Sequence, residues 1–194
     1  MAAISTILPL GTTAPSFDLP DTVTGSRVSI DHFADKKALL VMFICNNCPY
    51  VQHIRQGLVE LGEDYADSEL GIVAISANDP AAYPSDGPEE MAREAREFGY
   101  RFPYLYDEDQ EVAKAYTAMC TPDFFLFGPE RTLVYRGRFD QARPNMPEKV
   151  TGADLRAAVE AVLDDQPVSG QQFPSMGCSI KWKPGNEPDP SSVG

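Results

Sequence analysis

Two continuous apolar segments dominate the hydropathy pattern of the chain. Residues 38–44 (ALLVMFI) and residues 71–76 (GIVAIS) have the length of β-strands and carry no charge. Strands with one face in solvent alternate apolar and polar positions, whereas a continuous apolar run is typical of a strand buried on both faces. The pattern therefore predicts two buried strands.

Steps of three and four residues predict the helices. Directly after Cys48-Pro49, one apolar stripe with the spacing of a helix face is formed by Val51, Ile54, Leu58, Leu61 and Tyr65. Further helices are predicted over residues 89–98, 110–116 and 154–163. A Pro-rich loop over residues 78–88 connects the strand at 71–76 to the helix at 89–98.

Two pairs of short strands complete the pattern. Residues 124–127 and 132–136 flank a Gly-Pro turn and are expected to pair antiparallel, and residues 17–19 and 27–30 flank a turn at Thr24-Gly25. The order β-α-β-α-β-β-α predicts an α/β fold in which a central mixed sheet is flanked by helices, with an N-terminal β extension.

The composition supports one domain. The chain has 194 residues, of which 43% are hydrophobic, enough for a single core. We predict an N-terminal arm over residues 1–10, a folded domain over 11–168 and a partly irregular C-terminal extension over 169–194. The end of this extension, residues 183–194, has no apolar period and is predicted to be an extended, poorly ordered tail.

The charge balance is acidic, with 16 Lys and Arg against 29 Asp and Glu and a formal net charge of −13. Nucleic acids and anionic membranes bind clustered positive charge, so neither is an expected partner. The N-terminal sequence lacks the pattern of a secretory signal, and the longest apolar run is far shorter than the ~20 residues that span a bilayer. These patterns predict a soluble cytoplasmic protein, in which a cysteine pair is more often catalytic or metal-binding than structural.

One cysteine pair, Cys45-Asn46-Asn47-Cys48, lies between the buried strand and the helix. Two cysteines at this spacing can close a small disulfide ring, and the unpaired N–H groups at a helix N-terminus favour a thiolate. Pro49 suits the first helical turn, where a missing N–H has no cost. The pattern favours a redox pair over two cysteines that merely pack as small hydrophobic side chains.

A second element precedes the strand at 124–127. Thr121-Pro122 is a candidate cis-proline, which needs a tight turn; the alternative is an ordinary trans-proline at the start of a strand. Cys120 adjoins this turn, so it is either an accessory thiol near the redox pair or a buried structural cysteine. Cys178, in the C-terminal extension, is either an additional exchange thiol or a packed residue.

In order and spacing, the cysteine pair, Thr121-Pro122 and the hairpin that follows resemble the thioredoxin fold. Residues 11–19 and the insertion at 78–103 resemble the AhpC/TSA (peroxiredoxin-like) branch of that superfamily, which includes TlpA/ResA-type thiol–disulfide proteins. Residues 177–183 (GCSIKWK) resemble the ending of a bacterial group of uncharacterised thioredoxin-family proteins. The resemblance covers nearly the whole chain and implies an oxidoreductase that needs no cofactor beyond its redox-active cysteines.

The sequence also departs from both family patterns. In a peroxiredoxin the peroxidatic cysteine ends a Pro-x-x-x-Thr/Ser-x-x-Cys pattern; with Cys48 in that position, Val41 replaces the Pro and Cys45 replaces the Thr/Ser. In a thioredoxin the pair is Trp-Cys-Gly-Pro-Cys; here Ile44 replaces the Trp and two asparagines replace Gly-Pro. The sequence offers no clear counterpart of the buried acid that assists thioredoxins.

Three hypotheses follow. In the first, Cys45 attacks a protein or small-molecule disulfide, Cys48 resolves the mixed disulfide, a thiol reductant restores the pair, and Thr121-Pro122 presents main-chain groups to an extended substrate. In the second, Cys48 reduces a peroxide as an antioxidant, becomes a sulfenic acid, and is resolved by Cys45, Cys120 or Cys178. In the third, the four cysteines form a zinc site or the protein is a scaffold; the single close pair disfavours the zinc site.

Overall fold

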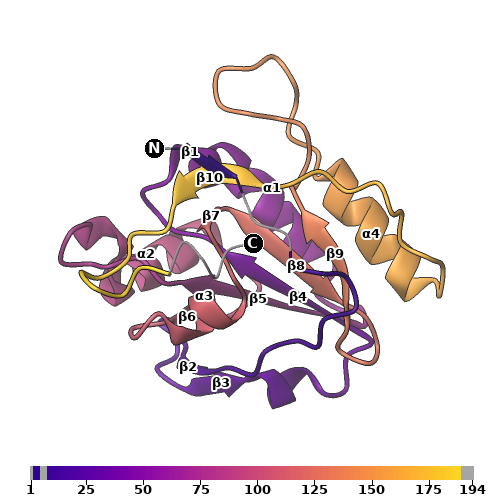
Figure 1. The fold of residues 1–194 in the computed structure, drawn as a ribbon, viewed down its shortest axis with the longest axis horizontal. Coiled ribbons are helices and arrows are strands. Elements are labelled where there is room, and N and C mark those ends of the chain that lie inside the picture. Colours follow the sequence, from indigo (N-terminus) through magenta and orange to yellow (C-terminus); the bar gives the residue numbers. More distant parts are fainter. Residues whose placement is uncertain (1, 5–7, 189–194) are drawn as a thin grey trace.

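The computed structural model describes residues 2–4 and 8–188, and its centre is a five-stranded mixed sheet (Figure 1). The order across the sheet is β6 (Tyr104–Tyr106), β5 (Leu70–Ser76), β4 (Ala38–Phe43), β8 (Asp123–Phe127) and β9 (Leu133–Gly137). β4 runs parallel to β5 and antiparallel to β8. The two apolar segments of the sequence are therefore adjacent central strands, and every residue of both is buried.

Successive residues of β4 point to opposite faces of the sheet and contribute to two separate cores. Leu40 and Met42 pack with α1 (Pro49–Asp64), α2 (Pro88–Phe98) and α4 (Ala153–Leu163). Leu39, Val41 and Phe43 pack on the opposite face, which is covered by α3 (Glu111–Ala115) and the hairpin of β2 (Asp18–Pro20) and β3 (Arg27–Ser29). This two-sided cover explains why the central strands contain no alternating polar positions.

The predicted elements occur close to their expected bounds, and the mixed sheet flanked by helices is confirmed. The turn between β2 and β3 is also confirmed, with Gly25 at a φ of 75° that favours glycine. Within the Pro-rich loop, the structure adds a short 3-10 helix, η2 (Pro84–Asp86), and a second one, η1 (Ile30–Phe33), begins where the strand predicted over 27–30 ends.

The sequence patterns miss a second sheet, which has three short strands in the order β1 (Ala2–Ile4), β10 (Met176–Ser179) and β7 (Cys120–Thr121). Both pairings are antiparallel. The predicted N-terminal arm and C-terminal extension thus lie side by side, as Figure 1 shows for β1 and β10. The central strand of this small sheet comes from the extension.

The chain after β10 contains no helix or strand through residue 188, but it is held against the domain. The backbone N–H of Lys183 donates to Gln110 Oε1 at 2.8 Å, and Asn186 Nδ2 donates to the carbonyl of Asp109 at 2.9 Å. Residues 189–194, the end of the predicted tail, lie outside the described residues. Within the described part of the chain, no helix has both the length and the apolar character needed to cross a membrane.

Candidate functional site

The two cysteines of the pair lie at the junction of β4 and α1. Cys45 follows the end of β4, and Cys48 is the N-cap residue of α1, with Pro49 as the first helical residue. Cys45 is only 2% exposed and Cys48 only 1%. Both thiols are free in the structure. The strand fixes one end of the pair and the helix start fixes the other.

The Thr121–Pro122 peptide bond is cis, as the sequence suggested, and it faces the pair. Cys45 Sγ lies 3.2 Å from Thr121 Oγ1. Cys48 Sγ donates to the main-chain carbonyl of Thr121 at 3.0 Å. Thr121, the residue before the cis-proline, therefore contacts both sulfurs, although it is more than seventy positions away from the cysteines in the sequence.

A fourth residue, Cys178, joins this group through β10. In the register of β10 with β7, Cys178 lies opposite Thr121 and Ser179 lies opposite Cys120. The sequence hypothesis expected the main chain at Thr121 to bind an extended substrate. In the structure, this main chain pairs instead with β10 of the protein itself. A substrate strand would have to displace β10 to use the same edge of β7.

The two thiols of the pair differ strongly in acidity. The pKa of Cys48 is lowered to about 5, and the largest cause is a hydrogen bond from the Cys45 thiol. Burial opposes this decrease. The Cys178 thiol and the backbone amides of Val51 and Cys178 lower the pKa further. The same shared hydrogen bond, together with burial and the charge of Asp86, raises the pKa of Cys45. In the structure Cys48 is a thiol that donates to Thr121. When the pair loses a proton, these contacts favour its loss from Cys48, the sulfur at the helix N-terminus, over its loss from Cys45.

This order of acidity favours Cys48 as the attacking thiolate, whereas the sequence hypothesis gave that role to Cys45. Besides the hydrogen bond between the two cysteines, the position of the helix start favours Cys48. α1 begins at Pro49, so Cys48 and not Cys45 is beside its first free amides. The spacing of the cysteines does not reveal that difference.

The asparagines between the cysteines are held by the η2 turn. Asn46 Nδ2 donates to the carbonyl of Ser85 at 3.0 Å, and the hydroxyl of Tyr104 donates to Asn46 Oδ1 at 3.1 Å. The backbone N–H of Asn47 donates to Asp86 Oδ1 at 2.9 Å. These contacts fix the conformation of the loop that carries both sulfurs.

Asp86 is a buried acid beside the redox loop, which sequence reasoning did not find. It is 1% exposed, and its second oxygen, Oδ2, accepts from Asn78 Nδ2 at 2.9 Å. Asn78 Oδ1 in turn accepts from the backbone N–H of Lys181 at 2.9 Å, just after β10. The only sequence signal was its location in an insertion between a strand and a helix, which does not distinguish Asp86 from neighbouring acids.

We expect Asp86→Asn to lower the free energy of unfolding by about 1–3 kcal/mol, because it sets two amide NH2 groups against each other or leaves a buried donor unpaired. Asn78 cannot simply rotate its amide, since its oxygen is needed by Lys181. Urea denaturation of the reduced protein measures the change. Glu89→Gln, at an exposed position nearby, is the matched control. Equal midpoints for both variants would contradict the assignment.

Cys120 lies near the site but takes no part in the sulfur contacts. It is fully buried, and its sulfur is 3.7 Å from the carbonyl oxygen of Pro122. Burial is the largest of the causes that raise the pKa of its thiol. Cys120 therefore fits the structural alternative better than the accessory-thiol alternative.

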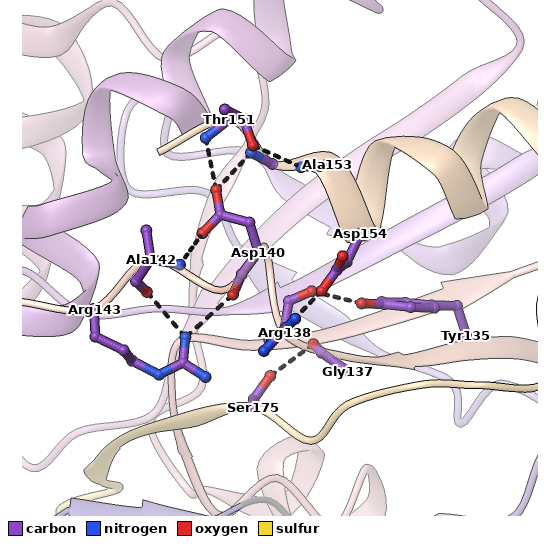
Figure 2. A network of polar contacts seen from close by, with 11 residues as sticks. Tyr135, Gly137, Arg138, Asp140, Ala142, Arg143, Thr151, Ala153, Asp154 and Ser175 are labelled. Atoms are coloured by element: carbon purple, nitrogen blue, oxygen red, sulfur yellow. Dashed lines mark hydrogen bonds and ion pairs between the residues drawn. The ribbon is translucent and has the colours of Figure 1, made fainter. Parts of the chain in front are cut away.

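The cis-proline also borders a small pocket, formed with Tyr50 and Ile54 of α1, Met176 of β10 and the segment after β9. Figure 2 shows how Asp140 fixes that segment: its carboxylate accepts from the backbone N–H groups of Ala142, Thr151 and Gly152. Arg143 Nη1 donates to the carbonyls of Asp140 and Ala142. The pocket volume of about 20 Å³ has room for about one water molecule.

The zinc alternative finds no support in the geometry. Among the described residues, no group of three or more His, Cys, Asp and Glu side chains is arranged to hold a metal ion.

A comparison with protein families matches the AhpC/TSA family over residues 10–136, well over half of the chain. The chain belongs to the AhpC/TSA family. This confirms the resemblance seen in the sequence and places the protein among thioredoxin-like redox proteins. Comparison with curated proteins gives no match.

Solved structures confirm the thioredoxin fold of this AhpC/TSA protein. An uncharacterised conserved protein from Geobacillus kaustophilus is 49% identical, with a TM-score of 0.93 over 95% of this chain and 97% of that one. A hypothetical protein from Sinorhizobium meliloti is 51% identical, with a TM-score of 0.92 over 94% and 99%. At 18% identity, the thioredoxin domain of a thiol–disulfide oxidoreductase from Bacteroides vulgatus shares the fold, with a TM-score of 0.59 over 77% and 97%.

Proposed function

We propose that this AhpC/TSA protein is a thiol–disulfide oxidoreductase with Cys45 and Cys48 as its redox pair. The observation that carries the proposal is the position of both sulfurs at the start of α1, each in contact with Thr121, the residue before the cis-proline. A thiolate beside a second thiol is the minimum that reversible disulfide exchange requires.

In the proposed reaction Cys48 is the attacking thiolate. Its sulfur attacks one sulfur of a substrate disulfide, and the other substrate sulfur leaves as a thiolate. Cys45 then attacks the Cys48 sulfur, gives up its proton to the leaving group and closes the Cys45–Cys48 disulfide, which releases the second substrate thiol. The substrate gains two electrons and the pair loses two. An external thiol reductant in the cytoplasm returns the pair to the reduced state.

The pH dependence of alkylation tests the acid of the pair. With the pKa of Cys48 at about 5, reaction of Cys48 with iodoacetamide should rise through a midpoint near that pH and stay flat from pH 6 to 8. Peptide mass spectrometry of briefly treated protein assigns the modified cysteine. A rate that increases tenfold per pH unit up to pH 8 would show an ordinary thiol and contradict the proposal.

A second function, reduction of peroxides, is favoured by one observation: Cys48 lies in one core cluster with Cys45, and the Cys178 side chain packs against that cluster. A sulfenic acid on Cys48 could condense with either thiol to a disulfide and release water. Consumption of hydrogen peroxide, with a dithiol as reductant, distinguishes the two functions. Consumption above the buffer rate that is lost in Cys48→Ser supports this function, and consumption at the buffer rate excludes it.

A further inference from the structure

The redox pair is poorly accessible. Cys45 and Cys48 are 2% and 1% exposed, and β10 occupies the edge of β7 beside them. Disulfide exchange needs a direct approach of one sulfur to another, so an external thiol must either displace β10 or exchange with a sulfur that is nearer to the surface.

Cys178 is such a sulfur. It is the one cysteine among the four that is not fully buried. It lies in β10 opposite Thr121, whose carbonyl accepts from the Cys48 thiol at 3.0 Å, and its side chain packs against the core cluster that contains Cys45 and Cys48. Each of the thiols of Cys48 and Cys178 also shifts the pKa of the other. Cys48 thus has its partner Cys45 on the same loop and a partly buried thiol, Cys178, on the strand next to Thr121.

The close approach of β10 is built into the sequence. A Cβ atom at Gly177 would lie 1.9 Å from the carbonyl oxygen of Thr121, so only glycine allows β10 this near the cis-proline loop. On the other side β1 pairs with β10, with Ala2 opposite Cys178. Cys178 is therefore held in the middle strand of a sheet, with little freedom to swing away from Cys48.

We propose that Cys178 is a third redox thiol, which exchanges electrons between the buried Cys45–Cys48 pair and external thiols through a Cys48–Cys178 disulfide. The proposal rests on the proposed redox function of the pair. It assigns an activity to the C-terminal extension.

The exchange step conserves electrons within the protein. In the oxidised pair, the Cys178 thiolate attacks the Cys48 sulfur; the Cys48–Cys178 bond forms, the Cys45–Cys48 bond breaks, and Cys45 leaves as a thiolate that takes a proton. An external thiolate of a protein or a small molecule next attacks the Cys178 sulfur and frees Cys48. A second external thiolate completes the two-electron reduction by releasing Cys178.

The electrostatics favour this step in the oxidised state. Burial is the largest cause that raises the pKa of Cys178, to about 11, and contacts with Cys48 add to it, whereas Lys181 lowers it. Once Cys48 is in a disulfide it carries no charge, so its part of the increase disappears. Cys178 is then more readily ionised when there is a disulfide for it to attack.

The first test traps the proposed disulfide. The Cys45→Ser, Cys120→Ala double variant is oxidised with diamide and digested without reduction. We expect a Cys48–Cys178 linked peptide in mass spectra and no free Cys178. Recovery of Cys178 as a free thiol, with Cys48 reduced or carrying only an external adduct, would overturn the proposal.

The second test leaves the pair intact. In Cys178→Ser the Cys45–Cys48 disulfide should still form, but its reduction by glutathione or by a protein thiol should be slower by at least about tenfold, because the external route through Cys178 is lost. Cys120→Ala is the matched control and should keep the wild-type rate. An unchanged rate in Cys178→Ser would refute the relay while the proposed function stands. Failure of the wild-type protein to form a Cys45–Cys48 disulfide would instead refute the proposed function.

Discussion

Replacement of Cys48 by serine is expected to slow the first step of disulfide exchange at pH 7 by at least about a hundredfold, since a thiol with an ordinary pKa of 9.0 is only about 1% ionised at that pH. Cys45 is the thiol that remains in the pair, and its pKa is raised above that ordinary value by burial and the charge of Asp86 even without Cys48. Stopped-flow reduction of a disulfide substrate by the reduced protein measures the rate.

The complementary variant gives the contrast. In Cys45→Ser a hydroxyl can donate to Cys48 in place of the Cys45 thiol, and the amide of Val51 and the Cys178 thiol remain around Cys48, so its first attack should persist. Cys120→Ala controls for loss of a buried sulfur outside the pair. The roles would be those of the sequence hypothesis, with Cys45 as nucleophile, if Cys45→Ser lost the first step and Cys48→Ser kept it.

Local patterns were sufficient for the parts of the fold that are locally determined. The apolar runs of β4 and β5 and the apolar stripe of α1 predict which residues are buried. This works because the position of a residue along a strand or helix determines the face on which its side chain lies. The cysteine pair was found for the same reason: it occupies the boundary between two such elements. The cis-proline was found from its position before an apolar strand.

The remaining parts depend on contacts that no local pattern encodes. β7 has two residues and β10 has four, too few to show a period, and each exists because of its pairing with the other. Asp86 is distinguished from other acids only by the folding of η2 against Asn47. The acidity of Cys48 depends on contacts with Cys45 and Cys178 as well as on the start of α1, so it follows from the tertiary structure.

The contacts between distant segments form one chain of hydrogen bonds that fixes the redox loop. Asp86 holds Asn47 and Asn78, and Asn78 holds Lys181, which follows β10. The insertion after β5 and the C-terminal extension are therefore coupled to each other as well as to the pair. A change that moves β10 should therefore alter the pKa of Cys48, both through the loss of the contact with Cys178 and through this chain of hydrogen bonds.

Gly177→Ala provides that change, and we expect it to detach β10 from β7. The new Cβ would lie 1.9 Å from the Thr121 carbonyl oxygen and 3.1 Å from Pro122 Cδ, and a backbone oxygen cannot rotate away as a side chain can. Steric overlap in a packed region costs about 1–3 kcal/mol or more. Displacement of the strand is the easier response, since β10 belongs to a small sheet near the end of the chain.

Displacement of β10 by Gly177→Ala should have three measurable consequences. Hydrogen exchange of residues 176–180 should accelerate, and Cys178 should be alkylated faster because it is more exposed. The pKa of Cys48 should rise from about 5, because the Cys178 thiol and amide that lower it have moved away. Gly170→Ala is the control, because a Cβ there meets nothing within 4 Å. If Gly177→Ala left both the exchange rates and the Cys48 alkylation profile unchanged, β10 would not be part of the redox site.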